Sequence, residues 1–284
     1  MPDLSSAASA ILLLQGILVL GGVALAGAWF FAPALRTRRR GPTHMPRWDA
    51  ALGDTFLIAW IALCTFFVGS LLAGSIMKQL GLEPTDGWAS VIAVLGFQGS
   101  MIAVLAVFAL YRRSLGRPLP PTEVRPAEPL ADRALVGAAV FCVAMPFVVG
   151  TSYLSTLAMN SLGLPIDNQE LANIFATADS PLLVLALTVV AVIVVPVSEE
   201  VLFRAGVFRI LARYLPHWAA VLISALAFAA LHGSMVHFIP LTVLGAIFAL
   251  AYERSGSLLV PITAHALFNL NSIIGLLAGL GATS

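Results

Sequence analysis

A short group of ionisable residues stands in one of the most apolar parts of the chain. The stretch "VVPVSEEVLFRAGVFRIL", residues 194–211, contains Glu199, Glu200 and Arg204 and continues an apolar run that starts at Pro181. An ionisable side chain near the centre of a bilayer costs about 2.5–3.5 kcal/mol on insertion scales, so residues of this kind usually serve a function. We therefore take these three residues as the first candidates for chemistry.

The spacing of the three residues separates their roles. Glu200 and Arg204 are four residues apart, so on a helix they share a face and can form an ion pair. Glu199 is rotated by about 100° from Glu200 on the same helix. We therefore predict that Glu200 and Arg204 neutralise each other, which leaves the Glu199 carboxylate for catalysis.

Two later apolar segments carry histidines. His232 ends one of them, one turn after Phe228, while His265 and Asn269 share a helix face in the last segment. At about 1.5 Å per residue, Glu199, His232 and His265 lie roughly 15, 21 and 12 Å from the expected cytoplasmic ends of their helices. Because these depths are similar, we expect the three helices to bring all of these polar side chains to one level.

A carboxylate, two imidazoles and an amide can support hydrolysis in two ways. In one, Glu199 is the general base for a water molecule that His232 holds, directly or through a metal. His265 and Asn269 then donate hydrogen bonds to an oxyanion. In the other, Glu199, His232 and His265 bind a zinc ion that keeps one position open. The residues alone leave both alternatives open.

The elements that position these residues are predicted to be transmembrane helices. Of the 284 residues, 60% are hydrophobic and only 10% are charged, whereas soluble domains are about 25% charged. A membrane span needs about 20 mainly apolar residues. We therefore predict an all-α, polytopic transmembrane helical bundle of about eight spans, at 8–32, 55–77, 88–111, 135–159, 181–208, 218–235, 236–253 and 257–280.

The chain is predicted to form two regions of one integrated membrane domain. Residues 1–180 form a four-helix membrane region without a recognisable motif, and residues 181–284 form the catalytic core, which carries every candidate residue. Arg-rich loops follow the first and third spans, and they place both termini outside and the basic loops in the cytoplasm. We expect a protein of the bacterial inner (plasma) membrane, whose basic loops contact lipid headgroups rather than nucleic acid.

Three short sequences resemble the motifs of a known family. "EEVLFR" at 199–204 resembles EExxxR, "FAALH" at 228–232 resembles FxxxH, and "HALFN" at 265–269 resembles HxxxN. These motifs occur in this order in the CAAX protease and bacteriocin-processing family of intramembrane endopeptidases. Over residues 181–271 the chain is similar to this family, which includes the type II CAAX prenyl endopeptidases.

The resemblance implies an all-helical membrane fold that hydrolyses a peptide bond of a membrane-anchored or prenyl-like peptide or protein. It implies that Glu199 and His232 activate water and that His265 and Asn269 form the oxyanion site. The residues it assigns to catalysis are Glu199, Glu200, His232, His265 and Asn269, with Arg204 and Phe228 in support. The family is often described as metal-dependent and a metal-free glutamate mechanism is also proposed, so the cofactor, a divalent metal such as zinc or none, stays open.

Other functions are compatible with part of this pattern. A non-proteolytic bacteriocin-immunity or binding protein of the same fold would be expected to have lost some motif positions, and all are present here. A proton-coupled transporter with Glu199 as the carrier would be expected to contain inverted repeats, and the two halves of the sequence show no such similarity. No HExxH motif occurs, which argues against a zinc site-two protease.

Overall fold

The protein is built from long apolar helices. The computed structural model describes residues 4–32, 45, 48, 51–122, 128–166, 174–175, 178 and 180–278, and in these ranges it contains no strand, which confirms the predicted all-α fold. The continuous helices are α1 (Leu4–Phe31), α3 (Leu52–Gln79), α4 (Gly87–Ser114), α5 (Leu130–Ser161), α10 (His217–Ala230), α11 (Met235–Ser255) and α12 (Leu259–Leu277). A composite helix, here named span five, joins α7 (Pro181–Val189), η2 (Val190–Val194), α8 (Val195–Glu200), η3 (Val201–Phe208) and α9 (Arg209–Tyr214).

Seven helical stretches in these ranges are long and apolar enough to cross a membrane, as expected of an integral membrane protein. The remaining helix, α10, has 14 residues. It rises about 21 Å, which is short of a hydrocarbon core of about 30 Å. The prediction of a full span at 218–235 is therefore wrong in length. Gly233 ends this segment with a φ of 63°, a left-handed conformation that glycine adopts readily.

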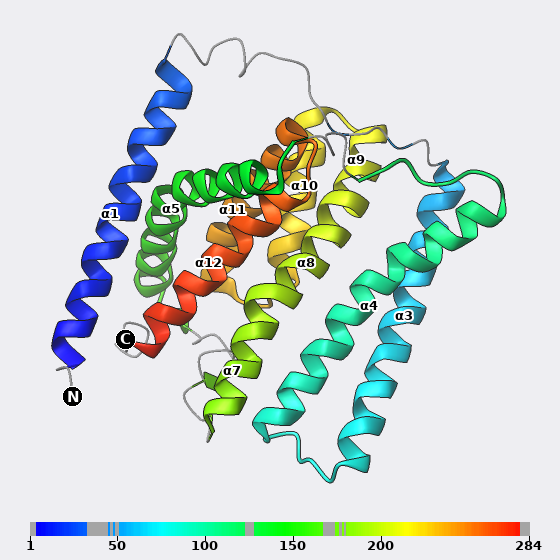
Figure 1. Ribbon diagram of the computed structural model, residues 1–284, viewed down its shortest axis with the longest axis horizontal. Helices are drawn as coiled ribbons and strands as arrows, with labels where there is room; N and C mark the ends of the chain where they lie inside the picture. Colours follow the sequence, from blue (N-terminus) through cyan, green and yellow to red (C-terminus); the bar gives the residue numbers. More distant parts are fainter. Residues whose placement is uncertain are drawn as a thin grey trace.

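Span five lies between two groups of helices (Figure 1). α3 and α4 pack as a pair on one side of it, and α4 contacts it along α7, η2, α8 and η3. α12 contacts η2 and α8 from the other side, and α5 connects α12 with α1 and α11. The arrangement surrounds the glutamates of α8 with helices from both halves of the chain.

Small residues let several of these helices approach closely. A Cβ atom on Gly96 of α4 would lie 2.9 Å from the Cβ of Ala73 on α3. A Cβ atom on Gly137 of α5 would lie 2.7 Å from the Cβ of Thr263 on α12. Close packing over small residues is a usual way for membrane helices to associate, because lipid tails supply no hydrophobic drive between them.

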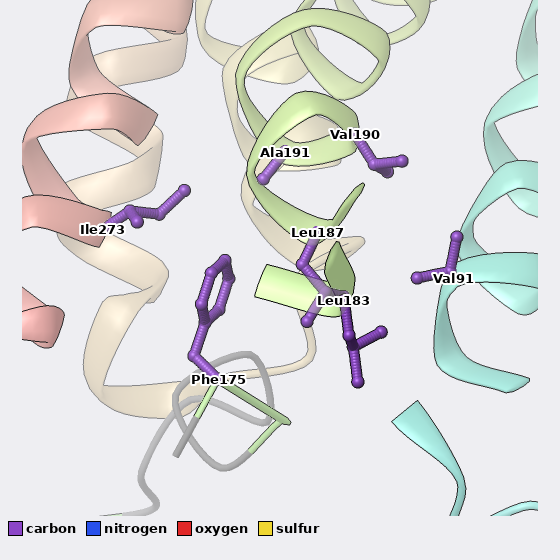
Figure 2. Packing of buried hydrophobic residues seen from close by; sticks show 7 residues of the cluster. All are labelled: Val91, Phe175, Leu183, Leu187, Val190, Ala191 and Ile273. Carbon is purple, nitrogen blue, oxygen red and sulfur yellow. The ribbon is translucent and has the colours of Figure 1, made fainter. Parts of the chain in front are cut away.

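A buried apolar cluster fixes the first half of span five (Figure 2). Val91 of α4 and Ile273 of α12 lie on either side of the leucines of α7. The buried members of the cluster are Val91, Phe175, Leu183, Leu187, Val190, Ala191 and Ile273. The segment that leads into the two glutamates is therefore held between α4 and α12.

Span five changes its helical geometry on both sides of these glutamates. α8 has six residues and lies between two π-helical segments, η2 and η3. At the junction of η2 and α8, the N–H of Val195 donates to the carbonyl of Val190, and the next residue, Pro196, has no N–H to donate. Such π segments are rare in proteins as a whole, and those that occur often lie at functional sites.

Candidate active site

The centre of the candidate site is Glu200, which lies between an arginine and a histidine. Arg204 Nε is 2.9 Å from Glu200 Oε2, and His265 Nδ1 donates to Glu200 Oε1 over 3.0 Å. All three side chains are buried. The predicted ion pair between Glu200 and Arg204 is thus confirmed. The Arg204 N–H is not aimed along the contact, so charge rather than a directed hydrogen bond holds the pair.

Glu199 approaches the same imidazole at its other nitrogen. Its Oε2 atom lies 3.9 Å from His265 Nε2, and the residue is only 6% exposed. Among the described residues, this oxygen has no hydrogen-bond partner. Two adjacent glutamates therefore flank one histidine, and only Glu200 is committed to hydrogen bonding with it.

Three phenylalanines surround the Arg204 guanidinium. Its carbon lies 4.7 Å from the ring centroid of Phe228, 5.4 Å from that of Phe248 and 5.9 Å from that of Phe203. One of its terminal nitrogens donates to the carbonyl of Gly245 over 3.0 Å. The faces of aromatic rings attract cations, and desolvation strengthens that attraction. The rings and the carbonyl therefore compensate for the removal of this cation from water.

Phe248 was missed by the sequence analysis. Its ring stacks on His265 with centroids 5.3 Å apart and planes 30° apart, while Phe228 meets the same imidazole edge-on at 5.8 Å. Phe248 follows Gly245 by three residues and so shares its face of α11. Nothing else distinguishes it in the sequence from the other apolar residues of that helix.

His232 packs against Phe228, whose ring also meets His265. It lies in the exposed turn after α10, where its Nδ1 is 3.0 Å from the carbonyl oxygen of Phe228. Its ring packs on Phe228 at 5.0 Å, and no contact with Glu199 is present in the part of the chain that the structure describes. α10 ends at Ala230, two residues before the histidine.

Asn269 contacts the backbone of span five. Its Nδ2 donates to the carbonyl oxygen of Ala191 over 2.8 Å. In a regular α-helix the N–H of Val195 would bond to this carbonyl, but here it bonds to Val190, and Pro196 has no N–H. The asparagine therefore supplies a hydrogen bond that the backbone of span five does not.

We expect Asn269→Ala to lower the free energy of unfolding by about 1–2 kcal/mol, since it leaves a buried carbonyl unpaired. In a Pro196→Ala background the loss is expected to be less than half as large, because alanine restores a backbone N–H that proline lacks. Unfolding in detergent of the parent protein, the two single variants and the double variant measures the loss of stability in each background. Equal losses in the two backgrounds would contradict the compensation.

The zinc set considered from the sequence is not assembled here. In the described ranges, no group of three His, Cys, Asp or Glu side chains is placed so that it could hold a metal ion. His265 Nδ1 is hydrogen-bonded to Glu200, and His232 lies in the turn outside the cluster. The residues therefore do not fit that metal.

An apolar groove runs beside the polar residues Glu199, Glu200, Arg204 and His265. It has a volume of about 240 Å³ and lies between span five and α12. Val197, two residues before Glu199, lines it from one side, and Ala266, next to His265, lines it from the other. Apolar chains can thus approach the helix turns that carry the polar residues.

Comparison with known proteins agrees with the motifs. The sequence model of one family, "Type II CAAX prenyl endopeptidase Rce1-like", matches residues 181–271. The "Putative membrane peptidase YdiL" of Bacillus subtilis (strain 168) is 36% identical over 81 residues, which cover 28% of this chain and 33% of that protein. The chain thus matches about a third of the length of this relative.

A second relative is matched over more of its length. The "Uncharacterized 24.3 kDa protein" of Escherichia coli is 32% identical over 172 residues, 58% of this chain and 72% of that protein. No solved structure matches the chain. With this extent of similarity and the match at 181–271, the chain belongs to the Rce1-like family of type II CAAX prenyl endopeptidases.

Proposed function

We propose that this protein is an intramembrane endopeptidase that hydrolyses a peptide bond of a membrane-anchored peptide or protein. The observation that supports it best is the buried Glu199 carboxylate facing His265 Nε2 at 3.9 Å. The relative in Bacillus subtilis is named a membrane peptidase, and the family is named for prenyl endopeptidases. Both names are consistent with hydrolysis at this site.

In the proposed reaction, Glu199 is the general base. Its free oxygen takes a proton from a water molecule while the water oxygen attacks the carbonyl carbon of the scissile bond. The carbon–nitrogen bond then breaks, and the same proton passes from Glu199 to the leaving amine. A new carboxyl terminus and a new amino terminus result.

His265 is proposed to stabilise the oxyanion. Glu200 accepts a hydrogen bond from the Nδ1–H of His265. This bond fixes the ring with Nε2 directed toward Glu199 and the reacting carbonyl. A proton on Nε2 can then be donated to the oxyanion, which is usually one of the largest contributions to catalysis. With both ring nitrogens protonated, the charges of Glu199, Glu200, Arg204 and His265 add to zero, which suits a buried cluster.

The substrate is proposed to carry an apolar anchor. A prenyl group or a transmembrane segment could lie in the groove between span five and α12, whose lining is apolar apart from Thr263. We place the protein in the plasma membrane of a bacterium with the Arg-rich loops in the cytoplasm, because the excess of arginine follows the positive-inside rule.

The test uses the purified protein in liposomes with fluorescent peptide reporters. One reporter is anchored by a C-terminal farnesyl group and one by a transmembrane helix. We expect cleavage of at least one, with isotopically labelled water oxygen appearing in the new carboxyl terminus. Mass spectrometry identifies the product and the position of the cut.

The controls separate hydrolysis from the alternatives. Glu199→Gln, inserted in equal amount, is expected to leave the reporters intact while the parent protein cuts them. If the parent protein were a binding or immunity protein, it would bind the reporters and cut none. Cleavage that is lost on chelation and restored by zinc would contradict the metal-free mechanism. Equal cleavage by the parent protein and by Glu199→Gln would contradict the proposed function itself.

A further inference from the structure

We propose that Gln98 of α4 is a positioning residue of the active site, an inference that rests on the proposed function. The Ser198 hydroxyl oxygen lies 2.6 Å from Gln98 Oε1 and also 2.7 and 3.0 Å from the carbonyl oxygens of Val194 and Val195, so its one proton has three acceptors, of which Gln98 is the nearest and the one on another helix. Ser198 is fully buried, Gln98 is 4% exposed, and Ser198 directly precedes Glu199. Gln98 lies in the N-terminal half, outside the segment that the family model matches.

The hydrogen bond lies between two apolar contacts of the same helix pair. Toward one end, Gly87 of α4 packs against Leu183 of α7. Toward the other, a Cβ atom on Gly206 of η3 would lie 3.2 Å from the Leu105 side chain of α4. α4 and span five therefore run in parallel over this distance, and Gln98 supplies a directed polar bond near its middle.

α8 depends on contacts of this kind for its orientation. It has only six residues, and Pro196 removes one of its backbone donors. From the side of α11 and α12 it is held by the Glu200–His265 hydrogen bond and, through η3, by the bond from Arg204 to Gly245. The bond from Ser198 to Gln98 holds it from the side of α4.

Consecutive residues on an α-helix are about 100° apart. A bond that keeps Ser198 directed at α4 therefore fixes the direction of Glu199, whose carboxylate must meet both water and His265. Loss of the bond would let α8 rotate and would change the 3.9 Å approach of Glu199 to His265. On this account, the N-terminal helices complete the active site rather than only anchoring it in the membrane.

The test is a double-mutant cycle on cleavage with Gln98→Met, Ser198→Ala and the combined variant. Polar contacts between membrane helices differ in strength, and we expect each single variant to lower kcat by about 3- to 15-fold with KM nearly unchanged. The combined variant is expected to be no slower than the slower single variant. Additive losses, or a parental kcat in either single variant, would overturn the proposal.

A matched control removes the same kind of bond elsewhere. The Ser155 hydroxyl of α5 donates to the Val236 carbonyl of α11 over 2.6 Å and is buried. Ser155→Ala is expected to change the unfolding temperature as Ser198→Ala does, with kcat unchanged. A fall in kcat equal to that of Ser198→Ala would assign both effects to general loosening of the bundle.

A second readout is independent of any substrate. Dicyclohexylcarbodiimide modifies carboxyl groups within the membrane, and mass spectrometry gives the rate at which Glu199 is labelled. We expect this rate to change at least about twofold in Gln98→Met and to stay constant in Ser155→Ala. If the parent protein cuts no reporter, the proposed function fails, and an unchanged labelling rate in Gln98→Met separately overturns the positioning role.

Discussion

Replacing Glu199 by glutamine lowers kcat for cleavage of a membrane-anchored reporter by about 10²- to 10⁴-fold, the usual contribution of a general base. Glutamine keeps the shape of the side chain but cannot accept the proton of the attacking water. The variant is expected to unfold at the parental temperature or slightly above it. The reason is that the substitution removes a buried charge whose Oε2 atom accepts no hydrogen bond within the described part of the chain.

The control for this substitution is a second buried glutamate. Glu253 of α11 is also 6% exposed, and its Oε1 atom lies 3.2 Å from His217 Nδ1, away from the Glu199–His265 pair. Glu253→Gln is expected to keep the parental kcat. Comparable losses of kcat in the two variants would mean that burial of the carboxylate, and not its place beside His265, explains the effect of Glu199→Gln.

Replacing Arg204 by methionine is expected to lower the free energy of unfolding by about 3–5 kcal/mol, the usual cost of removing one partner of a buried ion pair. The substitution leaves the Glu200 carboxylate fully buried with His265 as its remaining neighbour. It also removes the bond to the Gly245 carbonyl and the cation from the three phenylalanine rings. Chemical unfolding in mixed micelles, followed by tryptophan fluorescence, measures the change.

The double variant Glu200→Gln, Arg204→Met tests the cause. Because it removes both charges, no uncompensated charge stays in the interior, and we expect it to recover a large part of the lost stability. Arg204→Lys is expected to remain unstable, since an ammonium group does not reproduce the planar donor geometry of a guanidinium. A double variant that loses as much as the sum of the single variants would contradict this explanation.

The features that follow from local spacing were predicted correctly from the sequence. Helical geometry alone brings Glu200 to Arg204, and the apolar runs identify helices of membrane-spanning length. The contact of both glutamates with His265 was not predictable in the same way. It depends on how α12 is rotated against span five, and that rotation follows from packing between distant residues such as Gly137 and Thr263.

The errors have identifiable physical causes. The span predicted at 218–235 is too long because α10 ends at Ala230 and is followed by Gly233, which has a positive φ. The bond of Asn269 to Ala191 had no signal in the sequence, because in a regular α-helix Val195 would donate to this carbonyl, and only the π geometry of η2 diverts that N–H to Val190. Gln98 belongs to none of the three motifs and has only apolar residues three and four positions away, although an amide within a membrane helix also needs a partner.

The π segments of span five have a consequence for insertions and deletions. A π turn accommodates one more residue than an α turn, so deletion of one residue from η2 would return that segment to α geometry. A deletion in the regular helix α7, which has no such residue to give up, would instead turn the helix before it by about 100° relative to the glutamates, and the leucines there would no longer face α4 and α12. In a segment of almost interchangeable apolar residues, the alignment of the active site therefore depends on the number of residues more than on their identity.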